Sequence, residues 1–250
     1  MKNTCAFFPR SSALLLFLLG TLQAALPAKA QLPHGEDPVV MTINGEPVSA
    51  REYTLVMMRR ASEVYSIFKD NQDLNDHAGY WNERPDSPAP SPIRHLRDKV
   101  KAELVRIKVT QSLAREKGLI NDTTFAAFQE TWRTENIRRL NAIKASEVVY
   151  GPRQYGETAY YYICFGELNH RLQRALSSSP EYKVTEKELE ACYAANKSRY
   201  EGLSFSNVRV KLETIIRTAN YEAMIDKLCA AAKVENDDTR LRALVPRHDN

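Results

Sequence analysis

Residues that could carry out acid–base or metal chemistry are present in this chain, but their spacing matches no reaction motif. The sequence contains no His-Glu-x-x-His pair for zinc, no Gly-x-Ser-x-Gly nucleophile turn and no phosphate-binding Gly-rich loop. The five histidines are far apart, at His34, His77, His95, His170 and His248. We therefore predict no catalytic residue, no metal ligand and no cofactor, and we expect the histidines to lie on the surface.

Cysteine chemistry is also disfavoured. Cys164, Cys192 and Cys229 form no Cys-x-x-Cys pair, which argues against a thioredoxin-like redox site and a zinc knuckle. Three cysteines in an exported chain allow one disulfide and one thiol, or no disulfide at all. Because each lies beside apolar residues in a helical pattern, we interpret them as buried small apolar side chains.

The first 30 residues have the pattern of a secretion signal. A positively charged start is followed by an apolar run at 13–22, and Ala28-Lys29-Ala30 is a small-x-small cleavage site that places the cut after Ala30. The run is shorter than the roughly 20 residues of a membrane span. We expect an exported protein without stable membrane insertion, in the extracellular, cell-wall or periplasmic space, with a flexible start at 31–38. An uncleaved N-terminal anchor is the alternative.

The exported chain is close to neutral. The whole sequence has 35 Lys and Arg against 31 Asp and Glu, and Lys2, Arg10 and Lys29 belong to the signal. Without these three, 32 basic residues face 31 acidic ones. Nucleic-acid binding requires a clustered basic surface, so we expect no nucleic-acid partner.

Apolar residues recur at helical spacing through most of the exported chain, which predicts a mainly α fold. A polar, proline-rich loop at 70–91 separates the first two helices. At Tyr160–Phe165 residue propensity favours a strand, but apolar spacing favours a helix whose packed face is Tyr161, Phe165, Leu168, Leu172 and Leu176. The predicted helices cover 50–69, 92–117, 122–144, 158–177, 185–199 and 206–232. We expect Gly118 to end the second of these helices, Asp122 to cap the third, and Thr185 and Glu188 to form a capping box at the start of the fifth.

The two ends of the predicted domain are expected to meet. The residues 233–235 can form a strand that pairs with Val39–Ile43, closing one core at 39–235 with a small sheet. The remaining residues, 236–250, are interpreted as a polar tail.

The segment at 39–53 predicts a strand, an Asn-Gly turn and a helix opened by a capping box. Ser49 is expected to accept a hydrogen bond from the Glu52 amide, and the Glu52 side chain to reach back to the Ser49 N–H. This segment resembles the entry segment of the SurA/PrsA-type extracytoplasmic chaperones. The stretches at 104–119, 184–197 and 221–235 are similar to the same family.

The resemblance implies a multi-helix, SurA N-terminal-like chaperone core, but the parvulin isomerase domain of that family is missing. The domain normally lies between the last two of these stretches, but here only 199–208 joins the helix predicted at 185–199 to the helix predicted at 206–232, and paired histidines and a Gly-rich stretch are absent there. We therefore expect a holdase without isomerase chemistry. The alternatives are a foldase with residual peptidyl-prolyl isomerase activity and an accessory protein for a single envelope partner.

A holdase implies apolar surface that stays exposed and adapts to many sequences. The expected partners are unfolded or nascent exported polypeptides, and a homodimer is left open. Ordinary packing against neighbouring helices is the alternative for every candidate side chain. The candidates for client contact are Met57, Met58, Tyr65, Tyr80, Trp81, Tyr160 and Tyr162.

Overall fold

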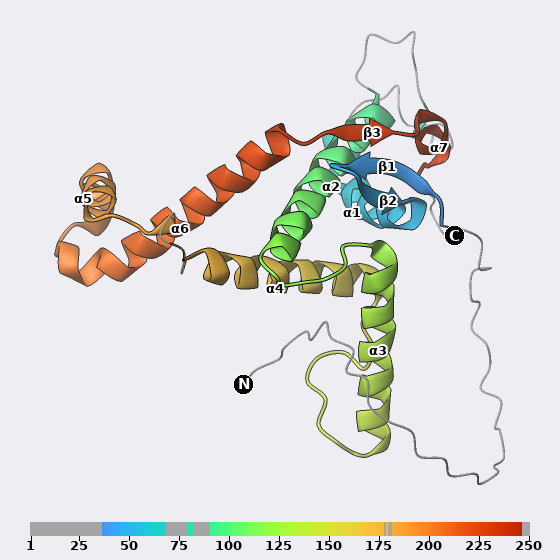
Figure 1. Cartoon of the computed structure of the whole chain (residues 1–250), viewed down its shortest axis with the longest axis horizontal. Helices are drawn as coiled ribbons and strands as arrows, with labels where there is room; N and C mark the ends of the chain where they lie inside the picture. Colours follow the sequence, from blue (N-terminus) through green and yellow to red (C-terminus); the bar gives the residue numbers. More distant parts are fainter. Residues whose placement is uncertain (1–36, 69–79, 83–90, 178, 180–181, 247–250) are drawn as a thin grey trace.

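Helices dominate the computed structural model, and a small sheet joins its chain ends (Figure 1). The described residues form seven α-helices, one short 3-10 helix and a three-stranded antiparallel sheet. The mainly α fold with a small sheet is therefore confirmed. Among these residues no helix is long and apolar enough to cross a membrane. The described residues are 37–68, 80–82, 91–177, 179 and 182–246.

Several predictions concern segments outside the described residues. These are the secretion signal with its cleavage site at Ala30, nearly all of the predicted flexible start at 31–38, and 70–79 and 83–90 of the proline-rich loop.

The sheet brings the two ends of the domain together, as predicted. Its strands, in sheet order, are β2 (Glu46–Ser49), β1 (Val39–Ile43) and β3 (Val234–Asn236). Asn44 and Gly45 connect β1 to β2 with φ of 51° and 82°, the left-handed pair that a tight hairpin turn requires. The Asn44 amide donates to the Lys233 carbonyl at 2.8 Å, so the same turn also fastens β3.

α1 (Ala50–Phe68) and α2 (Pro92–Glu116) pack together beneath the sheet and supply most of the main core. Pro92 occupies the first turn of α2, where its missing N–H costs nothing. Gly118, with φ of 68°, ends the helix as predicted. Buried side chains of the two helices include Tyr53, Val56, Val64, Ile93, Leu96, Val100 and Leu104.

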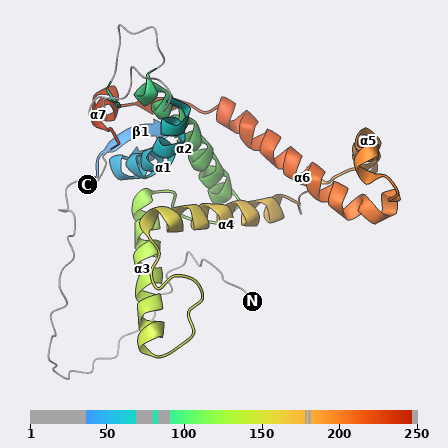
Figure 2. The same cartoon turned by 180° about the vertical axis from the view of Figure 1, so that it is seen from behind.

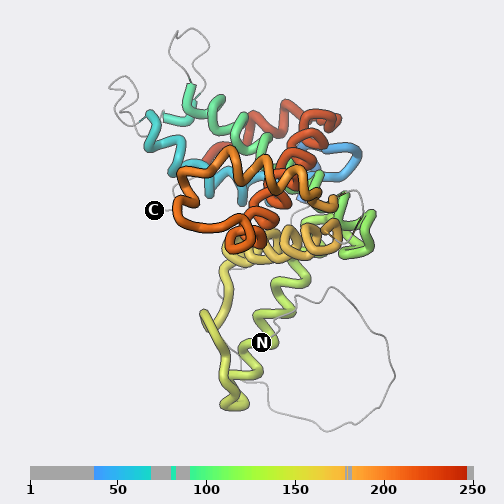
Figure 3. Tube along the Cα trace, turned by 90° about the vertical axis from the view of Figure 1, so that its left-hand side faces the viewer, coloured from blue at the N-terminus to red at the C-terminus, as the bar shows by residue number. Residues whose placement is uncertain are grey.

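α3 (Phe125–Lys144) projects away from the other helices, while α4 (Glu157–Ser177) crosses beneath α2 (Figure 1, Figure 3). The helix predicted at 158–177 is confirmed against strand propensity. Its buried residues Tyr161, Leu168, Leu172 and Leu176 follow one face. Asp122 was expected to cap α3, and this prediction is wrong. Thr124 caps α3 through the Ala127 amide, and Asp122 accepts from the Thr124 amide instead.

An arm consisting of α5 (Glu186–Ala195), the 3-10 helix η3 (Lys197–Tyr200) and α6 (Phe205–Ala230) extends away from the sheet (Figure 1, Figure 2). The predicted capping box between Thr185 and Glu188 is confirmed. The helix it opens ends earlier than expected, because the chain tightens into η3. The far end of the arm has its own core of Leu189, Tyr200, Val208 and Leu212.

The predicted polar tail from 236 is wrong for its first half. Asn236 belongs to β3, and α7 (Asp238–Ala243) follows, capped by Asp237 through the Arg240 amide. The Asp237 amide also donates to the Val40 carbonyl at 2.9 Å. Leu241 is buried against the main core, so this segment completes the sheet end of the domain.

The three cysteines form no disulfide among the described residues. Cys164, Cys192 and Cys229 are half-buried. Cys164 and Cys229 pack against the main core and Cys192 against the core of the arm, which agrees with their interpretation as small apolar side chains.

A buried ion pair lies where α1, α2 and α4 meet. Lys108 Nζ is 2.9 Å from Glu52 Oε2, and each side chain is only 1% exposed. The Tyr161 hydroxyl donates to Glu52 Oε1 at 2.6 Å, and Lys108 donates to the main-chain oxygen of Thr123 at 2.9 Å. Four segments of the chain thus share one polar contact in an apolar core.

The capping box predicted between Ser49 and Glu52 is therefore confirmed in only one of its two hydrogen bonds. The Glu52 amide donates to Ser49 Oγ at 3.2 Å, as predicted. The Glu52 side chain does not return to the Ser49 N–H, because Lys108 offers it a full positive charge in the core.

Burial raises the pKa of the Glu52 carboxyl, and Lys108 and Tyr161 oppose that shift. Burial, with the Glu52 charge, raises the pKa of the Tyr161 phenol well above its usual range.

Replacing Lys108 alone is expected to destabilise the protein strongly. In Lys108→Met the Glu52 carboxylate stays buried without its counter-charge, which costs about 3–5 kcal/mol in the free energy of unfolding at neutral pH. Denaturant unfolding measures this loss. Because the native state then binds a proton at Glu52 more tightly than the unfolded chain, the deficit shrinks as the pH falls toward 4.5.

The double variant Glu52→Leu with Lys108→Met is the matched control. It removes both charges together, so it should recover most of the lost stability. A single Lys108→Met variant as stable as the unmodified protein would contradict the role given to the pair.

Candidate functional site

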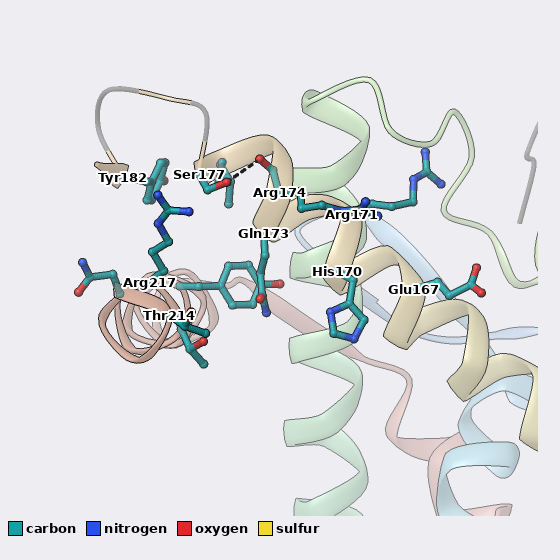
Figure 4. Close-up of a pocket in the computed structure, with 13 residues that line it drawn as sticks. Glu167, His170, Arg171, Gln173, Arg174, Ser177, Tyr182, Thr214 and Arg217 are labelled. Atoms are coloured by element: carbon teal, nitrogen blue, oxygen red, sulfur yellow. Dashed lines mark hydrogen bonds between the residues drawn. The ribbon is translucent and has the colours of Figure 1, made fainter. Parts of the chain in front are cut away.

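A groove of about 740 Å³ lies between the C-terminal half of α4 and the middle of α6 (Figure 4). Leu176 and Tyr221 form its buried floor, and Tyr182, from the connection to α5, lies at one end. Leu176 and Tyr221 belong to a second core cluster in which α4 and α6 pack against the end of α2. The groove is therefore formed where two helices separate after a shared contact.

Hydrogen bonds hold the aromatic side chains of the groove in place. The Tyr221 hydroxyl donates to Asn169 Oδ1 at 2.6 Å, which ties α6 to α4. The Tyr182 hydroxyl contacts Met224 Sδ at 2.7 Å. Burial raises the pKa of Tyr221 to about 12, so this phenol stays protonated and keeps donating at physiological pH.

The walls of the groove are polar. α4 contributes Glu167, His170, Arg171, Gln173 and Arg174 to the lining, and in Figure 4 Arg171 and Glu167 extend on the side of α4 away from α6. Gln173 points toward the cavity between the two helices. The wall is therefore rich in hydrogen-bond donors.

α6 forms the opposite wall with Thr214, Arg217 and Thr218. The Thr214 hydroxyl donates to the Val210 carbonyl at 3.0 Å, and Ser177 at the end of α4 donates to the Arg174 carbonyl at 2.9 Å. These two hydroxyls are thus engaged with the main chains of their own helices. An apolar floor between polar walls suits the binding of a flexible ligand.

The structure places four of the predicted client-contacting residues in the core, which corrects those predictions. Met57 is fully buried in the main core, while its neighbour Met58 is 42% exposed. Tyr80 and Trp81 are buried, with ring centroids 4.7 Å apart, and Tyr160 is buried near Phe128. Packing explains these side chains without any ligand.

Met58, Tyr65 and Tyr162 remain accessible to different degrees. Tyr65 is exposed on α1, with its ring beside that of Tyr80. The Tyr162 hydroxyl donates to Glu103 at 2.8 Å, and the guanidinium of Arg59 lies over its ring. Burial raises the pKa of Tyr162 above its usual range. None of the seven candidates lines the groove.

The groove residues were not predicted from the sequence. His170 was expected only to lie on the surface, and Leu172 and Leu176 only to pack. One sequence feature could have pointed to the groove wall. Arg171 and Arg174 lie one turn apart, on the side of the helix away from its apolar stripe. That pattern does not distinguish a solvated face from a groove wall, because the crossing of α6 creates the groove.

No family model, curated protein or solved structure matches this chain. The likeness to the SurA/PrsA-type chaperones therefore rests on the sequence motifs alone.

The Tyr221–Asn169 hydrogen bond is expected to contribute measurably to the α4–α6 contact. Tyr221→Phe removes the donor and leaves a half-buried amide oxygen without it, which should cost about 0.5–1.5 kcal/mol in the free energy of unfolding. Tyr150→Phe, at a site 73% exposed, is the matched control and should change little. Equal stability of the two variants would mean that this bond does not hold the groove floor.

Proposed function

We propose that this protein is an extracytoplasmic holdase that binds unfolded segments of exported polypeptides in the groove between α4 and α6, without ATP. The groove itself carries the proposal. Its volume of about 740 Å³ is enough for several side chains of an extended peptide, and its floor is apolar while its walls are polar. Such a surface accepts apolar side chains and leaves peptide groups near hydrogen-bond donors.

The composition of the walls favours binding without a demanding sequence requirement. Long side chains such as Gln173 can change rotamer to follow different ligands. Their hydrogen bonds to a bound chain exchange with bonds to water, so each adds little net affinity. A weak and distributed grip is what a holdase needs, because the client must leave in order to fold.

The arm offers a way to vary the width of the groove. Its far end holds a separate core around Leu189 and Leu212, so it keeps its shape independently of the main core. α6 contacts α4 near Tyr221 and contacts α2 through Arg106, which bonds to Glu222 and Asp226. A change in the α4–α6 crossing would widen the groove at the expense of the second core cluster around Leu176 and Tyr221, while the main core and the core of the arm stay intact.

The secretion signal predicted from the sequence supports an activity outside the cytoplasm, and the SurA/PrsA-like motifs support a role in folding. Met58 and Tyr65 on α1 offer further exposed side chains for client contact.

Filling the groove should weaken the holdase. Thr218→Trp places a bulky ring against the cavity from an exposed position on α6, and Thr134→Trp makes the same change on α3, outside the groove. Each protein is added to an unfolded, aggregation-prone client while light scattering is followed. We expect the unmodified protein and Thr134→Trp to suppress aggregation near stoichiometric ratios for several unrelated clients. Thr218→Trp should require a several-fold higher ratio.

Two results would redirect the proposal. If no unrelated client is protected, the accessory role with a single partner replaces the general holdase. If a protease-coupled proline peptide assay shows catalysis, the protein is an isomerase, and the absence of a parvulin-like motif has been misread.

A further inference from the structure

A second cavity, of about 250 Å³, lies at the sheet end of the domain. Its lining comes from β1, α1, the first half of α2, β3 and α7, and Figure 1 shows these elements gathered at one end of the molecule. The buried side chains of Met41, Tyr53 and Leu241 form its apolar base. None of its lining residues belongs to the α4–α6 groove, so this cavity is a separate candidate site.

The hydroxyl of Tyr53 is a buried polar group that the fold does not use. Tyr53 is only 2% exposed, and among the described residues no group forms a hydrogen bond with its hydroxyl. Burial raises the pKa of Tyr53 to about 12, and the charges of Arg97 and Asp98, which also line the cavity, act on the same phenol. A buried tyrosine usually finds a partner for its hydroxyl. Here a partner can reach the hydroxyl from the cavity.

Charged side chains of both signs surround this hydroxyl. α2 contributes Asp98 and Lys101 to the lining, and α7 contributes Asp238 and Arg242. Within each helix the two residues are three or four positions apart, a spacing at which opposite charges commonly pair. Neither pair comes within ion-pair distance, and none of the four is paired with another described residue. Two cationic and two anionic groups therefore line one small cavity without neutralising each other.

The walls of the cavity are held in place by contacts outside it. Arg97 donates to the main-chain oxygen of Arg242 at 3.2 Å, which ties α2 to α7. Leu241 packs in the main core, and the Asp237 amide donates to the Val40 carbonyl at 2.9 Å. The cavity is thus formed by the fold itself, as small-molecule sites usually are.

From this arrangement we infer that the cavity binds a small zwitterion of the α-amino acid class. The ligand carboxylate pairs with Lys101 or Arg242 and accepts from the Tyr53 hydroxyl, while its ammonium group pairs with Asp98 or Asp238. A simple anion or a simple cation leaves the opposite pair of charges unmatched. The volume of about 250 Å³ lies below the roughly 300–1,000 Å³ of pockets for drug-sized ligands, which suits a compact molecule. This inference does not rest on the proposed holdase function.

L-Alanine and its two halves test the inference. Propionate keeps the carboxylate without the ammonium group, and ethylammonium keeps the ammonium group without the carboxylate. Chemical shifts of the ¹⁵N-labelled protein are followed while each compound is added. Because the charges are partly exposed, each pairing adds modestly to affinity. At low salt we expect L-alanine to bind about 2- to 5-fold more tightly than either half. The difference should shrink at high salt.

Three variants locate the binding. Tyr53→Phe removes the hydroxyl and keeps the ring, so it should weaken L-alanine binding several-fold while denaturant unfolding shows little change. Arg242→Gln should weaken L-alanine and propionate but leave ethylammonium unchanged. Arg94→Gln makes the same change at an exposed site of α2 outside the lining and should affect none of the three compounds.

Four results would overturn the inference. Absence of L-alanine binding rules out the site, and equal affinity for L-alanine and propionate makes it a site for a simple anion. Unchanged L-alanine affinity in Tyr53→Phe, or equal weakening by Arg94→Gln and Arg242→Gln, places the binding elsewhere on the protein. Each of these results leaves the holdase proposal as it stands, because the groove shares no residue with this cavity.

Discussion

The buried ion pair between Glu52 and Lys108 determines how three helices meet. A carboxylate in an apolar core is tolerated only beside a positive charge and hydrogen-bond donors, so Lys108 on α2 and Tyr161 on α4 must come to Glu52 on α1. Lys108 also holds the Thr123 carbonyl just before α3. Apolar contacts alone would permit sliding between these helices, whereas the polar contact specifies one arrangement.

The position of α4 has consequences at its other end. With Tyr161 fixed near the start of the helix, its later turns run past the end of α2 and reach α6. There Leu172 and Leu176 pack with Tyr221 and Ile225, and the Tyr221–Asn169 bond completes the contact. The groove begins beside this contact. Its floor is thus an extension of the core, and its walls are the polar faces that the two helices keep in water.

Sequence patterns predicted the parts of this fold that depend on local chemistry. The Asn44-Gly45 turn, the Thr185–Glu188 capping box and the apolar stripe of α4 each follow from residue type and spacing. The pairing of β3 with β1 was also predicted, because it closes the domain by joining its two ends in one small sheet.

The failures concern side chains with two competing environments. Glu52 fits a helix cap by its position, but a lysine distant in sequence attracts its side chain into the core. Met57, Tyr80 and Trp81 were candidates for exposure, yet they are buried by helices whose relative placement the sequence does not reveal. The groove was missed for the same reason: its walls come from helices that meet only in three dimensions.

The central claim is that the α4–α6 groove holds unfolded polypeptide, and site-specific photo-crosslinking tests it most directly. A photoreactive amino acid is placed at position 218 in the groove, or at position 134 on α3, and an unfolded exported client is added before illumination. The account predicts crosslinks from position 218 that disappear when the client is folded, and few from position 134. Equal crosslinking from both positions, or none from position 218, would contradict it.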